Sequence, residues 1–122
     1  MPKRVLVVDD ELSIRALITR ILELEGVEVR SAGSAADGIR ELEASRFDVV
    51  VTDMRMETPD AGFAVLRFAS SLRPTPKLML LSAYAISRAD LGEQFPGVRI
   101  VQKGADTLNL PALLREVIKQ AA

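Results

Sequence analysis

Two residue types that often build catalytic and metal sites are absent from this chain of 122 residues, which contains no cysteine and no histidine. Without cysteine there is no disulfide and no thiolate metal site. Without histidine, Ser-His catalysis, an imidazole base and most zinc sites are excluded. A metal ion bound by this chain would therefore be a hard cation held by oxygen ligands, such as Mg²⁺.

Long apolar runs and an excess of positive charge are missing as well. No segment approaches the ~20 apolar residues of a membrane-spanning helix, and residues 1–4 lead into an apolar run too short for a signal peptide. The 16 basic and 17 acidic side chains give a net charge of −1, whereas general nucleic-acid binding needs a basic excess. We therefore expect a cytoplasmic protein with no direct nucleic-acid partner and no membrane contact.

Charge is distributed unevenly between the two halves of the chain. Residues 1–61 carry 8 basic and 13 acidic side chains, whereas residues 62–122 carry 8 basic and 4 acidic ones. Chance surface composition would account for this difference, and so would a cation site in the first half with a partner-binding face in the second. The length and the 48% hydrophobic content fit one domain over residues 1–122.

Apolar runs typical of strands alternate with segments of helical periodicity along the chain. Such alternation predicts an α/β fold, in which right-handed crossovers place helices on both faces of a parallel sheet. The predicted strands cover residues 5–8, 27–30, 47–53, 78–82 and 98–102, and the helical patterns cover residues 14–22, 35–42, 63–71, 84–95 and 110–118.

Several residues suggest where these helices begin and end. Gly26 stops the first helix in the position that glycine favours. Ser34 and Asp37 resemble a capping box at the start of the second helix. Asn109 or Thr107 is expected to cap the last helix. The apolar face of the first helix is predicted to consist of Ile14, Leu17, Ile18, Ile21 and Leu22.

Polar side chains follow four of the five predicted strands. The first strand runs into Asp9 and Asp10, the third ends in Asp53, the fourth ends in Ser82, and Lys103 follows the fifth. The carboxyl ends of parallel strands lie along one edge of a doubly wound sheet, where such folds bind ligands. If the first and third strands are neighbours, three carboxylates converge there.

Three carboxylates around one point need a compensating cation, and oxygen ligands suit Mg²⁺. Mg²⁺ attracts a phosphoryl group, and a carboxylate can attack that group and hold it as an acyl phosphate. Lys103 would neutralise one phosphoryl oxygen, and Ser82 would donate a hydrogen bond to another. Singly, an aspartate here is usually a cap and Lys103 a solvated lysine. Only the combination of these residues at the strand ends indicates a functional site.

The residues at these strand ends resemble the receiver domain of bacterial two-component response regulators. The resemblance covers nearly the whole chain and implies a flavodoxin-like (βα)₅ three-layer sandwich, with a five-stranded parallel sheet in the order 2-1-3-4-5. Its marks are Val7-Val8-Asp9-Asp10-Glu11, Val50-Val51-Thr52-Asp53-Met54-Arg55-Met56, Leu81-Ser82-Ala83 and Lys103.

The resemblance also implies a role for each site residue. Asp53 is the expected phosphoacceptor. Asp10 and Asp53 are expected to bind Mg²⁺ directly, together with the backbone carbonyl of Arg55, whereas Asp9 acts through a bound water. Ser82 and Lys103 are expected to contact the phosphoryl group.

By the same resemblance, a sensor histidine kinase or phosphotransfer protein would donate the phosphoryl group and dock near the first helix. Phosphorylation would shift a two-state equilibrium and reshape the face made by the fourth helix, the fifth strand and the fifth helix. The charge of the second half independently suggests that a partner binds residues 84–118. That face would contact an output partner or a fused effector domain. A homodimer is also an open possibility. Slow self-catalysed loss of the phosphoryl group would not make the protein an enzyme.

The sequence departs from the family pattern at several positions. Ile100 stands where the family usually has an aromatic switch residue, and Tyr84 is a possible substitute. Gly104 replaces a proline that is usually cis, so slow isomerisation of that bond is not expected. Glu57 replaces a frequent proline, and Gly62 comes one residue late. We therefore expect a differently shaped loop after Asp53.

Two other functions fit parts of this pattern. An aspartate-nucleophile phosphatase would resemble the haloacid dehalogenase family, whose motif needs an aspartate where this chain has Glu11, and it would need a cap domain. A receiver-like interaction module that works without phosphorylation would keep its partner after Asp53→Asn.

Overall fold

The computed structural model describes residues 2–91, 93–104 and 106–121 of the chain. Its strands form one parallel sheet in the order β2-β1-β3-β4-β5, which confirms the predicted α/β class and strand order. The strands are β1 (Arg4–Val8), β2 (Glu28–Ala32), β3 (Val49–Asp53), β4 (Lys77–Ser82) and β5 (Arg99–Gln102). The helices are α1 (Leu12–Leu24), α2 (Ala35–Ala44), α3 (Ala61–Ser71), α4 (Arg88–Leu91) and α5 (Leu110–Gln120), preceded by the 3₁₀ turn η1 (Thr107–Asn109).

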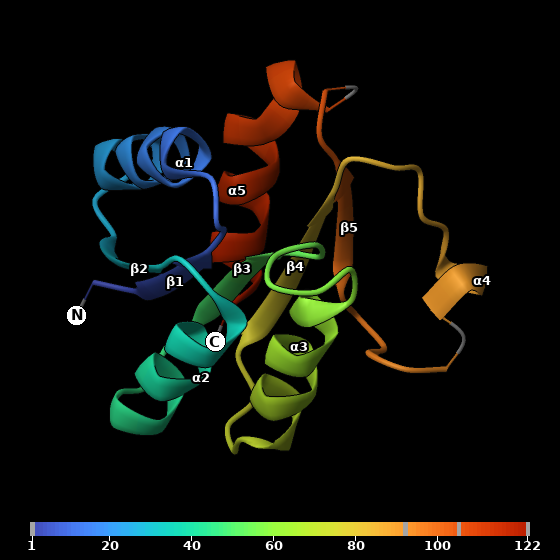
Figure 1. Ribbon diagram of the computed structural model, residues 1–122. Coiled ribbons are helices and arrows are strands. Elements are labelled where there is room, and N and C mark those ends of the chain that lie inside the picture. The colour runs from blue at the N-terminus through green and yellow to red at the C-terminus, as the bar shows by residue number, and fades with distance from the viewer. Residues whose placement is uncertain (1, 92, 105, 122) are drawn as a thin grey trace.

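Helices cover both faces of this sheet. Figure 1 shows α1 and α5 on one face and α2 and α3 on the other, which gives the expected three-layer sandwich. Strand β1 is buried on both faces: Val5 and Val7 pack with α1 and α5, whereas Leu6 and Val8 pack with α2 and α3. Its side chains from residue 5 to residue 8 are 0% exposed, which explains why the run is apolar at every position.

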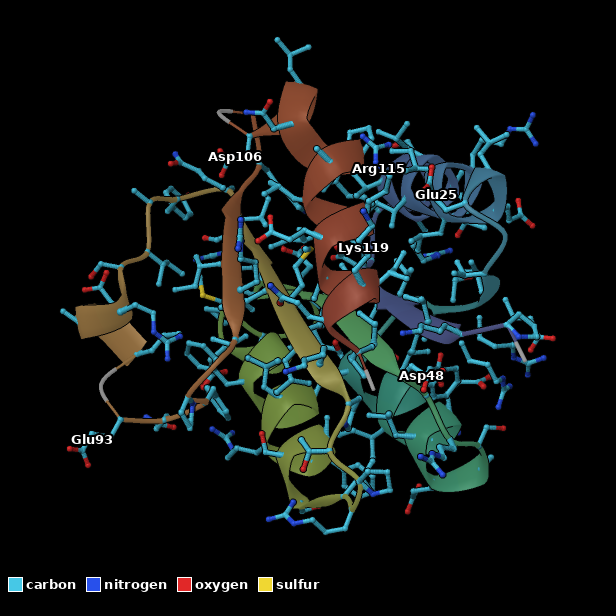
Figure 2. The ribbon with its side chains drawn as sticks, turned by 180° about the vertical axis from the view of Figure 1, so that it is seen from behind. Glu25, Asp48, Glu93, Asp106, Arg115 and Lys119 are labelled. Atoms are coloured by element: carbon cyan, nitrogen blue, oxygen red, sulfur yellow. The ribbon has the colours of Figure 1, made fainter. Side chains whose placement is uncertain are left out.

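The layer of α1 and α5 is also joined by charge. Arg115 of α5 lies 3.7 Å from Glu25, the residue that follows α1, and Figure 2 shows these two side chains at the junction of the helices. Both side chains are partly exposed, so the pair contributes little to stability. The apolar contacts beneath it hold this layer together.

Strand register brings the predicted site residues to one edge. Val8 of β1 pairs with Thr52 of β3, so the residues that follow them, Asp9 and Asp53, lie side by side at the sheet edge. Ser82 ends β4 beside Gln102 of β5. The parallel arrangement thus aligns the strand ends as the sequence predicted.

Some predicted boundaries were wrong. Among the described residues 84–91 and 93–95, the expected helix is reduced to the four residues of α4, because few large apolar side chains there can anchor a longer helix. Residue 92 lies outside the described residues. The second strand extends to Ala32, since its last residues still pair with β1. The third strand begins at Val49 instead of Phe47, and α3 begins at Ala61 instead of Phe63.

The predicted helix ends had mixed outcomes. Ser34 Oγ accepts a hydrogen bond from the Asp37 amide at 3.1 Å, which confirms the cap of α2. Gly26 follows α1 with φ +79°, as a terminating glycine should. Asn109 stands at the start of α5 but its side chain makes no capping bond, and the side chain of Thr107 lies outside the described structure. Leu17, expected on the inner face of α1, is 45% exposed.

Candidate functional site

The three aspartates predicted to converge lie together at the carboxyl edge of the sheet. Asp9, Asp10 and Asp53 each offer a carboxylate oxygen, and these oxygens lie within 4.8 Å of one another. Asp9 is 0% and Asp53 is 5% exposed, whereas Asp10 faces solvent. This arrangement confirms that β1 and β3 bring their acids to one place.

Lys103 reaches this acidic group from the end of β5. Its Nζ lies 3.1 Å from Asp9 Oδ2 and 3.2 Å from Asp53 Oδ2. The Lys103 amide donates to the Ser82 carbonyl at 2.7 Å, which ties the residue to β4. Asp106, at the top of Figure 2, closes the turn because its carboxylate accepts from the Gln102 amide at 2.8 Å.

Burial and charge set the protonation of the group. Burial raises the pKa of Asp53, and the neighbouring charge of Asp9 raises it further. The Lys103 ammonium and the Met54 amide lower that pKa only in part. Burial lowers the pKa of Lys103, but its close contacts with the Asp9 and Asp53 carboxylates outweigh burial, so the pKa is raised. Counted as formal charges, the two buried carboxylates outnumber the one ammonium that contacts them.

This excess of negative charge fits a hard divalent cation. Asp9 Oδ2 is buried and, within the described chain, faces the Lys103 ammonium without a hydrogen bond of good geometry. Carboxylate oxygens are ligands that Mg²⁺ accepts, and a bound Mg²⁺ would relieve the repulsion between the acids. The residues present therefore fit the cation that the sequence predicted.

Backbone contacts hold the acids in place. Asp9 Oδ1 accepts from the Glu11 amide at 3.0 Å, and the Arg15 guanidinium donates to the Asp9 carbonyl at 2.7 Å. Asp53 Oδ1 accepts from the Met54 amide at 2.9 Å. The Arg15 contact was not predicted, because a bond from a helical side chain back to a strand-end carbonyl leaves no periodic signal in the sequence.

A cavity of about 360 Å³ opens beside these acids. The exposed Arg55 and Tyr84 lie on its wall, with the guanidinium carbon 6.0 Å from the centre of the ring. Ser82 is 1% exposed and is not among the described lining residues, and its hydroxyl accepts from the Tyr84 amide at 3.1 Å. Asp10, Asp53, Arg55, Met56, Tyr84 and Lys103 are among the residues that line the cavity.

Gly62 allows α3 to begin directly against the end of β3. A Cβ at this position would lie 2.2 Å from the Asp53 carbonyl oxygen and 2.8 Å from the Met54 Cα. The Gly62 amide donates to the Met54 carbonyl at 2.8 Å. The shift of this glycine by one residue is visible in the sequence, but the close approach to backbone is not.

Comparison with known proteins identifies the class that this fold and site define. The family model described as response regulator receiver domain matches residues 5–114. The chain therefore belongs to the response regulator receiver domain family, as the strand-end motifs predicted. Within the described residues, no helix has both the length and the apolar character needed to cross a membrane.

Longer named proteins are similar to nearly the whole of this chain. It is 32% identical over 120 residues to a protein-glutamate methylesterase/protein-glutamine glutaminase of Azospirillum brasilense, which covers 95% of this chain and 29% of that protein. A similarly named protein of Paramagnetospirillum magneticum is 33% identical over 117 residues, covering 93% of this chain and 29% of that protein. The chain thus spans under a third of the length of these relatives.

Solved structures share the whole fold. A CheY-like response regulator receiver domain protein of Methanospirillum hungatei has a TM-score of 0.82 and 25% identity, with 98% of this chain and 96% of that chain covered. The response regulator TrrA of Thermotoga maritima, solved in complex with Mg²⁺-BeF, has a TM-score of 0.71 and 28% identity, with 94% and 98% covered.

Proposed function

We propose that Asp53 is the phosphoacceptor of this receiver domain and that Mg²⁺ assists the transfer. The observation that carries the proposal is the convergence of Asp9, Asp10 and Asp53 with Lys103 at one edge of the sheet. Asp10, Asp53 and the Arg55 carbonyl would hold the cation, with Asp9 acting through a water. The bound Mg²⁺ supplies positive charge that screens the carboxylates and the incoming phosphoryl group.

The chain's own residues then carry the chemistry. A carboxylate oxygen of Asp53 forms a bond to phosphorus while the bond between phosphorus and the donor's leaving atom breaks, which leaves an acyl phosphate. Lys103 moves from its contact with the free carboxylate to a phosphoryl oxygen and neutralises it. Ser82 donates its hydroxyl to another phosphoryl oxygen once it turns from the Tyr84 amide. Water later cleaves the acyl phosphate slowly, without an outside substrate.

Residues 1–122 form one receiver domain in this proposal, with partners on both sides of the reaction. A sensor histidine kinase or phosphotransfer protein donates the phosphoryl group, and an output partner or fused effector domain reads the result. The methylesterase names of the longer relatives support an effector outside the matched region. The face within residues 84–118 is the proposed output surface and the proposed site of any homodimer.

Phosphorylation by a small donor tests the proposal directly. The chain incubated with acetyl phosphate and Mg²⁺ should gain one phosphoryl group in its intact mass, and Asp53→Asn should gain none. Asp60→Asn removes a carboxylate from the same loop and should still be labelled. Labelling of Asp53→Asn to the wild-type level would contradict the assignment, and steady turnover of a phosphomonoester would favour the phosphatase.

A further inference from the structure

The carboxylate of Glu57 joins the loop between β3 and α3 to the start of α2. Glu57 Oε1 accepts a hydrogen bond from the Ala35 amide at 2.9 Å, and Oε2 accepts one from the Ala36 amide at 3.2 Å. The next amide of α2, that of Asp37, bonds instead to Ser34 Oγ. The first turn of α2 is therefore capped by two side chains, one local and one from a distant loop.

The other end of this connection is fixed to β1. A Cβ on Gly38 of α2 would lie 2.8 Å from a methyl carbon of Val8, so helix and strand pack at the closest possible approach. Val8 directly precedes Asp9 and Asp10 in the chain. The packing of Gly38 on Val8 therefore fixes the position of α2 relative to the acids that follow β1.

The loop that Glu57 holds forms a wall of the candidate site. Arg55 and Met56 line the same cavity as Asp10 and Asp53, and Glu57 follows them directly. Two successive amides of α2 bond to the Glu57 carboxylate, so the loop is attached to the helix at a point next to the cavity wall.

We propose that Glu57 is a positioning residue that fixes the Arg55 carbonyl relative to Asp10 and thereby sets the affinity of the site for Mg²⁺. This inference rests on the proposed function. Glu57 does not contact the cation. A ligand supplied by a loop must be ordered when the ion binds, and a loop already fixed to α2 has less ordering left to do.

The test compares Mg²⁺ affinity in three variants of the full chain by isothermal titration calorimetry. Glu57→Gln weakens the contact with Ala35 and Ala36, and we expect Mg²⁺ to bind roughly fivefold more weakly. Ser34→Ala removes the local cap of the same helix but leaves the loop attached, so its Mg²⁺ affinity should stay at the wild-type value. Glu43→Gln removes one negative charge from an exposed position of α2 and controls for net charge.

Wild-type protein gives an independent readout in case a variant fails to fold. If the Glu57 contact favours Mg²⁺ binding, then Mg²⁺ must favour the contact equally. Hydrogen exchange of the Ala35 and Ala36 amides should therefore slow when Mg²⁺ is added, and should be faster in Glu57→Gln.

Three results would overturn the inference. Glu57→Gln could bind Mg²⁺ as tightly as wild type. Ser34→Ala could weaken Mg²⁺ binding as much as Glu57→Gln does. The rate of amide exchange at Ala35 and Ala36 could stay the same when Mg²⁺ is added. In each of these cases wild-type Mg²⁺ binding still stands, and with it the proposed function. Failure of the wild-type chain to bind Mg²⁺ at all would instead overturn the proposed function, together with this inference.

Discussion

The strand-end site, defined as Asp9, Asp10, Asp53 and Lys103, and the segment of residues 83–98 are held in the fold by different means. Most of the site's groups are buried and paired with backbone amides or with one another. Within its described residues, 83–91 and 93–98, the segment contains the four-residue helix α4 and presents Tyr84 at 62% exposure.

A few anchors attach the segment to the rest of the molecule. Leu91, Phe95 and Val98 are buried against the α3 side of the sheet, and the Phe95 ring stacks on Phe63 with centroids 5.9 Å apart. Figure 1 shows α4 standing away from the other helices beyond β5. The comparison teaches that the chemistry is placed on a tightly fixed edge, and that the proposed output face includes a part with low local stability.

Glycine substitutions should produce the largest difference in stability between the strand-end site and the segment. Gly62→Ala places a Cβ against the backbone of Asp53 and should lower the free energy of unfolding by about 3 kcal/mol. A Cβ added by Gly97→Ala in the segment meets no atom within 4 Å. This variant should lower the free energy of unfolding by only about 1 kcal/mol, from the strain of φ +85°. Urea unfolding measures the free energy of unfolding of both variants. Equal losses of stability would contradict the difference between the strand-end site and the segment.

The second-largest effect is expected from the removal of the Lys103 ammonium at the strand-end site. Lys103→Met leaves Asp9 and Asp53 without their ammonium and should lower the free energy of unfolding by about 2 kcal/mol in the absence of Mg²⁺. The same variant should bind Mg²⁺ more tightly, because the lysine charge no longer opposes the cation. The exposed Lys77→Met serves as the control. Weaker Mg²⁺ binding by Lys103→Met would show that the lysine does not compete with the ion.

The charge of Asp53 should cost stability at neutral pH. Because its pKa is raised above the ordinary 3.8, the folded state holds the proton more tightly than the unfolded state. Stability therefore falls as pH rises from about 4 through the raised pKa. Asp53→Asn should be about 1 kcal/mol more stable than wild type at pH 7 without Mg²⁺, and this gain should vanish below pH 4.

Thermal unfolding across this pH range measures the effect of Asp53, with Asp60→Asn as a control that shows no such gain. A gain that persists unchanged at low pH would contradict the electrostatic cause.

Lys103 affects stability at alkaline pH. Its raised pKa adds stability that is complete below its ordinary 10.5 and is lost as pH rises through the higher folded value.

The smallest effect is expected within the segment. The Arg88 guanidinium donates to the Phe95 carbonyl at 3.1 Å and to the Val98 carbonyl at 3.2 Å. Arg88→Met should lower the free energy of unfolding by roughly 0.5 kcal/mol. It should speed amide exchange within residues 84–98 and leave Mg²⁺ affinity unchanged, and a change in that affinity would mean that the two regions are coupled in the resting state.

The sequence was most informative where a residue sits at the end of an apolar run. The runs that end at Asp9 and Asp53 predicted buried parallel strands, and parallel strands bring their ends together whatever the loops between them do. The α/β fold therefore followed from the sequence pattern, whereas the strand order came from the resemblance to receiver domains. The meeting of the three acids followed on the condition that β1 and β3 are neighbours, which the sheet satisfies. The length of α4 could not be predicted, because residues 84–95 have weak periodicity and few large apolar side chains that would anchor a helix.

Contacts between distant side chains and backbone could not be predicted. The sequence shows that Glu57 stands where the family often has proline, but only the fold shows that its carboxylate reaches the amides of Ala35 and Ala36. The bond from Arg15 to the Asp9 carbonyl is of the same kind. Such bonds depend on loop geometry and side-chain direction, which no local pattern encodes.

The most direct test of the account is to locate the phosphoryl group on the wild-type chain. After reaction with acetyl phosphate, reduction of the acyl phosphate marks the modified residue for peptide mass spectrometry. The account predicts one mark, on Asp53, that forms with Mg²⁺ and is lost when the cation is chelated before the reaction. A mark on any other residue, or equal labelling of Asp53 without Mg²⁺, would contradict it.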